Sequence, residues 1–296
     1  MSNLTEDIIA ILRRNGRAAY SEIARELNTN RDYVASQINP LLESGDLRIV
    51  AGVHPRVLGL NVCAHLSIRV GGNIRLVVEA LERLDAPVLI SIVSGSFQVA
   101  VELRLPSMPE LQEQVARIRG IDGIAEVYVL LYERVLSSFF LHEEPDSFTF
   151  EFDETDIRIV AILQKDGRAN FADVADQVGM SLSGCRTRVQ RLLDSGVMQI
   201  GAIKRRSDTT DDLLVGIGVN AREDLQKVAE LLRTHNGLEF IARTVGRFDM
   251  IATVGFASPR DFKRFLSRLR ALPGVTYSEQ WLHVSILREV PWGRQL

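Results

Sequence analysis

The 296-residue sequence has few of the residues that cross-link or metallate small proteins. Its two cysteines, Cys63 and Cys185, lie far apart, which fits neither a disulfide framework nor the spacing of a zinc site. No two of the five histidines, at positions 54, 65, 142, 235 and 283, have metal-ligand or catalytic spacing. We therefore read both cysteines as small core residues, and we expect no catalytic residue, no metal site and no cofactor.

Long apolar runs and a large excess of one charge are also absent. No stretch is long enough to span a bilayer, and no signal peptide is recognisable, so we expect a cytoplasmic protein without a membrane partner. The net charge of −3 excludes a protein coated in positive charge but permits a local basic surface, which nucleic acid binding requires. Length and an apolar content of 46% suit two or more globular domains.

The chain contains an internal repeat. One constant offset aligns five pairs of segments: NGRAAY at 15–20 with DGRANF at 166–171, IIAIL at 8–12 with IVAIL at 159–163, LLESG at 41–45 with LLDSG at 192–196, GSF at 95–97 with GRF at 246–248, and DG at 122–123 with PG at 273–274. Chance similarity of helical patterns would not keep this register, so the chain is a duplication of one two-part unit.

The clearest segment of the second copy, residues 161–196, predicts a helix-turn-helix, with a preceding helix expected at 157–165. A helix over 171–178 is closed by Gly179, which suits a left-handed C-cap. After a tight turn, a second helix begins behind Ser181 or Ser183, both good N-caps. Two helices joined in this way are typical of DNA-binding proteins.

The second of these helices carries the DNA-binding prediction. One face is apolar, and the other presents hydroxyls, an amide and guanidinium groups, which reach base edges and phosphates. An ordinary solvated helix face is the alternative, but the tight turn and a following basic run favour DNA. The candidate DNA-binding residues are Ser183, Arg186, Thr187, Arg188, Gln190 and Arg191 on the helix, and Lys204 and Arg205 in the basic run.

The first copy predicts a weaker DNA reader. Asp32 on its groove face would repel phosphates, and Pro40 inside its last helix is expected to kink that helix or end it early. The helices of this copy are expected at 6–14, with Thr5 as N-cap, at 20–27 and at 31–44. The three arginines of the second copy are replaced by Ala35, Gln37 and Pro40.

After each helix-turn-helix the pattern becomes β-α-β-β-α-β, the ferredoxin-like arrangement. Helices cover one face of such a sheet and a second sheet often covers the other, so we expect like domains to pair. The elements are expected at 60–70, 74–84, 88–93, 97–103, 108–119 and 124–131, and again at 213–219, 225–234, 238–245, 248–256, 259–272 and 275–287.

We therefore predict an α+β chain in which two winged or three-helix helix-turn-helix domains are each followed by a ferredoxin-like domain. The predicted parts are a degenerate helix-turn-helix DNA-binding domain at 1–50, a ferredoxin-like domain at 51–142, an acidic linker at 143–151, a second helix-turn-helix domain at 152–202 and a second ferredoxin-like domain at 203–296.

This arrangement resembles the Lrp/AsnC family of transcription regulators, over nearly the whole chain and twice. The resemblance is carried by residues 162–197, by RTVGRFDMIATV at 243–254 and by SILREV at 285–290. It implies that the helix-turn-helix parts bind double-stranded DNA, and that the following RAM-type domains pair and sense a small effector such as an amino acid. Most members are single units, so this fused chain is expected to form a homo-oligomer or its own pseudo-dimer.

The resemblance also implies a place for the effector, near the glycine turn between the central strands. A glycine lets a ligand approach the backbone, Arg247 suits a carboxylate and Asp249 suits an ammonium group. An ordinary hairpin turn is the alternative, and the first copy lacks both charges. The candidate ligand-binding residues are Gly246, Arg247, Phe248 and Asp249, with Gly95 and Ser96 in the first copy.

Two other classes of function compete with a regulator. Sirohaem decarboxylases resemble the same fused architecture and would use histidine and arginine near the sheet. His65 and His283 fall in predicted strands, where a structural histidine is more common, and no nucleophile motif or phosphate loop is present, so we expect no enzyme. A ligand-binding or assembly module that has lost DNA binding is favoured by the poor first recognition helix. We expect a sequence-specific transcriptional regulator.

Overall fold

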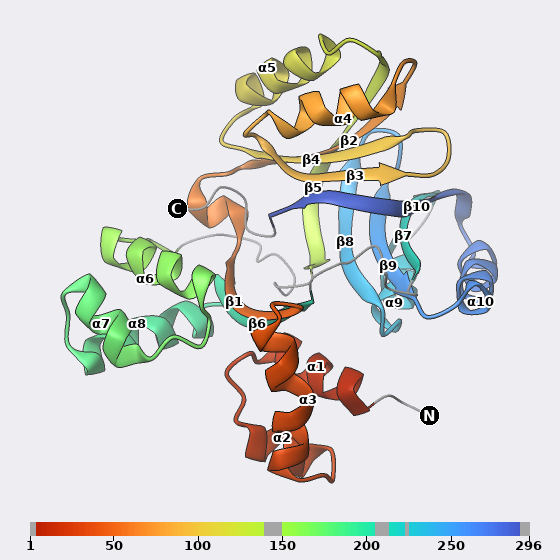
Figure 1. Cartoon of the computed structure of the whole chain (residues 1–296). Coiled ribbons are helices and arrows are strands. Elements are labelled where there is room, and N and C mark those ends of the chain that lie inside the picture. Colours follow the sequence, from red (N-terminus) through yellow and green to blue (C-terminus); the bar gives the residue numbers. More distant parts are fainter. Residues whose placement is uncertain (1–3, 139–149, 205–212, 223–224, 291–296) are drawn as a thin grey trace. The chain divides into compact units, whose positions relative to one another are not determined.

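The computed structural model describes residues 4–138, 150–204, 213–222 and 225–290, and it separates into two compact units (Figure 1). The first unit combines 4–57 with 150–204, and the second combines 58–138 with 213–290. Like parts of the two copies therefore join each other. Arg205 and residues 143–149 of the predicted linker lie outside the described residues, and the finer domain limits remain predictions. No helix in the described ranges is long and apolar enough to cross a membrane.

The first unit holds both helix-turn-helix domains. Strand β1 of the first domain pairs antiparallel with β6 of the second, from Leu47 opposite Lys204 to Val53 opposite Met198. The predicted element list contained neither strand. The elements are α1 (Leu4–Arg14), α2 (Tyr20–Glu26), α3 (Arg31–Glu43), β1 (Leu47–Val53) and a 3-10 turn at Pro55–Leu58 in the first copy, and α6 (Glu154–Lys165), α7 (Phe171–Val178), α8 (Leu182–Asp194) and β6 (Met198–Lys204) in the second.

Two equivalent arginines clamp the helix-turn-helix domains together. Arg17 donates to two backbone carbonyls of the second domain, each at 2.8 Å, and lies 4.0 Å over the ring centroid of Phe171. Arg168 donates to two carbonyls of the first domain, at 2.7 and 3.1 Å, and lies 5.0 Å over Tyr20. The contacts are reciprocal, so the first unit has pseudo-twofold symmetry. The accepting carbonyls are those of Gly167, Ala169, Gly16 and Ala18.

The second unit joins the two ferredoxin-like domains into one closed sheet, in the order β10-β3-β4-β2-β5-β8-β9-β7. The two long strands make the joins: β5 pairs first with β2 and then with β8, and β10 pairs first with β7 and then with β3. The elements are β2 (Val62–Val70), α4 (Ile74–Glu82), β3 (Pro87–Val93), β4 (Val99–Leu105), α5 (Met108–Arg119) and β5 (Ile124–Ser138), then β7 (Leu213–Ala221), α9 (Leu225–Arg233), β8 (Leu238–Val245), β9 (Met250–Phe256), α10 (Pro259–Arg270) and β10 (Val275–Glu289).

Alternation along the strands builds separate cores on the two faces of this sheet. Val99 and Val101 point toward α4 and α5, whereas Ala100 between them belongs to the interior. Figure 1 shows α4 and α5 on the outer side of β2, β3 and β4. The interior core draws on both copies and contains Cys63, Val93, Ala100, Leu130, Tyr132, Ala242, Phe248, Ile251 and Trp281. Both cysteines are buried and free, as predicted.

Two local expectations are wrong. Helix α1 begins before Thr5, so this residue is not an N-cap; its hydroxyl instead donates to Oε1 of Gln37 at 2.7 Å. Helix α3 does not end early at Pro40 but continues to Glu43, which makes it as long as α8. A proline near the end of a helix removes one backbone hydrogen bond, and the buried Val34 and Ile38 anchor α3 just before this position.

Candidate DNA-binding surface and ligand pocket

The turn before α8 has the geometry that its sequence predicts. Gly179 closes α7 in the left-handed region, at a φ of 74°. Ser181 is the N-cap of α8, and its hydroxyl oxygen accepts the N–H of Gly184 at 3.2 Å. This cap fixes where α8 begins and therefore which of its side chains face outward.

An exposed polar face runs along α8. The Thr187 hydroxyl donates to the carbonyl of Ser183 at 3.0 Å, and the Gln190 amide donates to the Asp194 carboxylate at 2.7 Å. Arg186 is exposed, and within the described residues its guanidinium has no hydrogen bond or ion pair. Arg186 is thus a cation on this face that is available to a phosphate or a base edge.

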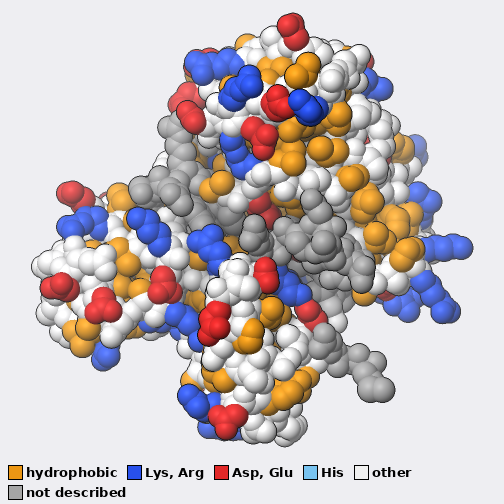
Figure 2. Space-filling view, in the orientation of Figure 1, with side chains coloured by type: hydrophobic (Ala, Val, Ile, Leu, Met, Phe, Trp, Pro, Cys, Tyr) orange, Lys and Arg blue, Asp and Glu red, His pale blue; other side chains and the backbone are white. Residues whose placement is uncertain are grey.

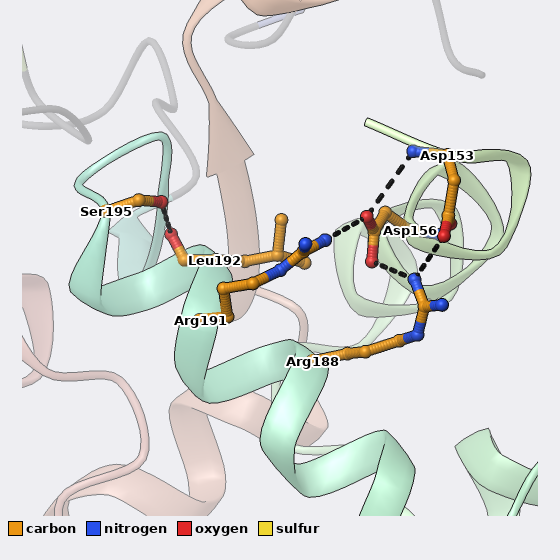
Figure 3. A network of polar contacts seen from close by, with 6 residues as sticks. All are labelled: Asp153, Asp156, Arg188, Arg191, Leu192 and Ser195. Carbon is orange, nitrogen blue, oxygen red and sulfur yellow. Dashed lines mark hydrogen bonds and ion pairs between the residues drawn. The ribbon is translucent and has the colours of Figure 1, made fainter. Parts of the chain in front are cut away.

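The other two candidate arginines of α8 turn back onto α6 (Figure 3). Arg188 contacts two carboxylates, Asp153 at 2.5 Å and Asp156 at 2.9 Å. Arg191 pairs with the second oxygen of Asp156, and its guanidinium lies 4.8 Å over the ring of Phe150. The Asp156 side chain is 0% exposed, whereas those of Arg188 and Arg191 are 31% and 49% exposed.

Two groups of this network, Asp153 and Arg188, stabilise each other's ionised forms. The pKa of Asp153 is lowered first by the backbone N–H of Asp156 and then by Arg188. The pKa of Arg188 is raised by its hydrogen bonds to Asp153 and Asp156. A buried carboxylate without a partner is strongly destabilising, so Asp156 depends on these arginines.

Sequence reasoning missed this pair of aspartates, because it began the helix at Ile157. The structure begins α6 at Glu154, with Asp153 and Asp156 forming a reciprocal capping box. An Asp-x-x-Asp pattern before an apolar run was the available signal.

The remaining basic candidate, Lys204, is partly neutralised. Its ammonium lies 2.5 Å from Glu6, and its side chain is 33% exposed. In α3, Arg31 lies 3.6 Å from the highly exposed Asp32. On the face shown in Figure 2, basic and acidic side chains are interspersed over both helix-turn-helix domains. The cationic character of this unit is therefore local.

The two glycine turns of the sensing unit contribute to one pocket. Ser96 from the first turn and Arg247 from the second lie in its wall. The Arg247 guanidinium pairs with Glu279 at 3.0 Å, with side chains 27% and 19% exposed, and lies 4.7 Å over the ring of Phe97. The lining residues are His65, Ser67, Val93, Ser94, Ser96, Phe97, Val99, Ala100, Arg247, Glu279 and Trp281.

His65 adds a neutral imidazole to this pocket. Burial, and then the nearby Arg247 charge, lower the pKa of His65 to about 4. At neutral pH the charged groups among the lining residues are therefore Arg247 and Glu279. A cation and an anion side by side match the two ends of a zwitterion.

The other predicted ligand residues are occupied by contacts or backbone geometry within the protein itself. Asp249 accepts the backbone N–H of Ala221 at 3.0 Å, and Gln98, at the equivalent position of the first copy, accepts that of Val70 at 2.9 Å. Phe248 is buried, and Gly95 and Gly246 have φ values of 103° and 145°. A Cβ on Gly246 would lie 2.8 Å from a methyl carbon of Leu130. A valine there would disturb the fold as well as any ligand.

The equivalent place in the second copy is filled by aromatic rings. Gly216 stands where the first copy has His65, and a Cβ there would lie 2.0 Å from the indole nitrogen of Trp281. Gly218 stands where the first copy has Ser67, and a Cβ there would lie 2.4 Å from Phe248. Of the two equivalent strands β2 and β7, only β2 thus contributes polar residues to the pocket.

Comparison with solved structures corrects one prediction. The crystal structure of the siroheme decarboxylase NirDL matches 97% of this chain and 93% of its own, with a TM-score of 0.65 and 16% identity. NirDL in complex with an iron-uroporphyrin III analogue matches with a TM-score of 0.63 and 15% identity. The expectation that this is no enzyme is overturned, because an enzyme has the same whole-chain fold. At this identity the likeness shows the fold alone.

Sequence comparison identifies both types of domain. The winged helix-turn-helix DNA-binding family matches residues 1–45 and 152–197, and the Lrp/AsnC ligand binding domain matches 213–287. An HTH-type transcriptional regulator of Pyrococcus horikoshii is 24% identical over 47% of this chain and 95% of its own length. The regulator LysM of Sulfurisphaera tokodaii is 23% identical over 42% and 89%. The chain therefore belongs to the Lrp/AsnC family of DNA-binding transcriptional regulators, in a form with two helix-turn-helix domains.

Proposed function

We propose that this regulator reads double-stranded DNA mainly through α8 and that a small zwitterion in the sensing unit controls the binding. The supporting observation is the exposed face of α8, where Arg186 lies beside Ser183, Thr187 and Gln190 and has no ion pair with any residue that the structure describes. The equivalent face of α3 presents Asp32 instead. Because both units join the two copies within one chain, each chain supplies its own pseudo-dimer. A regulator of chromosomal DNA would act in the cytoplasm.

The DNA-binding proposal is tested by selecting the bound sequence from random duplexes and then measuring affinity by gel shift. Arg186→Ala is expected to weaken binding by about 1–3 kcal/mol, because a guanidinium contact to DNA is lost. Arg31→Ala, which removes an exposed cation from α3, is the matched control and is expected to have a smaller effect. Equal losses in the two variants would contradict the proposal that α8 contributes more to DNA binding than α3. A selection that recovers no bound sequence would contradict the proposed function.

The effector proposal rests on the Arg247–Glu279 pair in the pocket. Arg247 would bind a carboxylate and Glu279 an ammonium group, so an amino acid or a similar zwitterion fits both. A ligand changes DNA affinity only if it binds one arrangement of the protein better, and typical coupling is about 1–3 kcal/mol. The lining comes from both copies, which makes one such site per chain the expected stoichiometry.

Calorimetry against the common amino acids tests this site. Glu279→Gln is expected to lower the affinity for the bound amino acid at least tenfold, because the ammonium group loses its counter-charge. Glu126→Gln breaks another ion pair of the same unit and is the control. An unchanged affinity in Glu279→Gln would place the site elsewhere. Sirohaem is titrated in parallel, and a visible absorbance change with no amino acid response would favour the decarboxylase reading.

A further inference from the structure

The two copies of the helix-turn-helix provide an internal comparison for the network in Figure 3. With an offset of 151 residues, the distance from Asn15 to Asp166, Asp156 is equivalent to Thr5 and Arg188 to Gln37. Thr5 and Gln37 are hydrogen bonded at 2.7 Å, just as Asp156 and Arg188 are ion paired at 2.9 Å. The same two positions are therefore in contact in both copies, with different chemistry.

The charges of this network are replaced as a set. In the sequence of the first copy, every charged position of the network is uncharged, so that each version is neutral overall. If the arginines only bound DNA, their replacement in one copy would not require the two aspartates at the start of another helix to be replaced as well. The equivalent residues are Ser2 for Asp153, Thr5 for Asp156, Gln37 for Arg188 and Pro40 for Arg191.

Burial explains why these substitutions must be coupled. Asp156 is fully buried, and removing its cationic partners would leave an uncompensated charge in the core. A threonine at that position needs only a neutral partner, which an amide supplies. Arg186 is different, since it is exposed, has no partner within the described residues and is replaced by Ala35 in the first copy.

We propose that Arg188 and Arg191 are positioning residues that hold α8 on α6 through Asp156, and that Arg186 is the cation of this helix that contacts DNA phosphate. This inference rests on the proposed DNA function for the role of Arg186. The role of Arg188 and Asp156 in folding stands independently of it. Orientation of the reading helix is thus built into the second copy by a charged pair and into the first by a neutral one.

The test transplants the first copy's pair into the second. The variants are Arg188→Gln, Asp156→Thr, the double variant and, as the same Arg-to-Gln change elsewhere on this helix, Arg186→Gln. Urea denaturation is expected to give lower midpoints for both single variants and a largely restored midpoint for the double variant. A double variant no more stable than the singles would show that the two positions are not coupled, and the proposal would be wrong.

The dependence of DNA affinity on salt separates positioning from phosphate contact. Each phosphate contact that is lost reduces the slope of log K against log salt concentration by about one. The slope is expected to become less steep in Arg186→Gln and to stay unchanged in the double variant, although each of these proteins lacks one arginine. An equal fall in the double variant would assign Arg188 to the DNA. If neither the wild type nor any variant binds DNA, the proposed function is wrong, but the denaturation result still tests the coupling of Asp156 and Arg188.

Discussion

At the scale of single residues, this protein buries ionisable side chains in two opposite ways. Asp156 is fully buried and forms ion pairs with two guanidinium groups. His65 lies in the closed sheet next to the positive Arg247 and stays neutral, and burial and that charge lower its pKa to about 4. The first arrangement stabilises a charge, and the second makes folding sensitive to acid.

We expect stability to depend on pH through His65. Its unfolded pKa is near 6.5 and its folded pKa about 4, so between these values the unfolded chain takes up a proton that the folded chain does not. The free energy of unfolding is therefore unaffected by the titration of His65 above pH 6.5. Between pH 6.5 and about pH 4 it falls progressively, by about 3 kcal/mol at most. Urea denaturation at pH 7, 5.5 and 4.5 should give a shallower pH dependence for His65→Gln than for the wild type. Parallel curves would refute a neutral buried histidine.

At the scale of elements, the two copies are connected in the closed sheet by long strands that each pair with one strand of either copy. Residues 124–131 of β5 pair with β2 of the same copy, and residues 131–138 pair with β8 of the other. In the first unit, β1 and β6 are short and pair with each other, assisted by Arg17 and Arg168. The two helix-turn-helix domains are therefore held together by this strand pair, by the two clamp arginines and by the packing of α1 on β6 and of α6 on β1.

Removing either clamp arginine tests this reading. Arg17→Ala or Arg168→Ala is expected to lower the free energy of unfolding by about 2 kcal/mol, because carbonyls lose charge-assisted hydrogen bonds. Lysine at either position should not restore stability, since an ammonium group lacks the planar fork that spans two carbonyls. Arg25→Ala, an exposed arginine at the end of α2, is the control for denaturation. A loss no larger than that of the control would show that the clamps do not stabilise the pairing.

At the scale of the whole molecule, the copies have diverged in complementary directions. The second copy keeps a cationic reading helix, and glycines let aromatic rings fill its side of the closed sheet. The first copy has Asp32, Ala35, Gln37 and Pro40 on the equivalent helix and supplies His65, Ser67 and Ser96 to the pocket. In a regulator of two separate identical subunits every substitution appears twice. Fusion removes that constraint, so DNA reading and effector binding can be divided between the halves.

The sequence alone determined most helices and strands, since these depend on local features. Gly179 and Ser181 set the turn before α8, and the periodic apolar residues set the order β-α-β-β-α-β. The repeat and the family followed from the same local patterns. Capping, turn chemistry and hydrophobic period act over a few residues, so they can be read without knowing what lies nearby.

Only the tertiary structure decided which residues from distant segments meet. The candidate arginines of α8 look alike in sequence, yet the buried Asp156 on another helix pairs with Arg188 and Arg191, whereas Arg186 pairs with no residue in the described part of the chain. Ser96 and Arg247, expected at two separate turns, line one pocket because β10 crosses to the other copy's sheet. Burial and partner distance set the role of each charge, and both depend on packing between segments that are far apart in the chain.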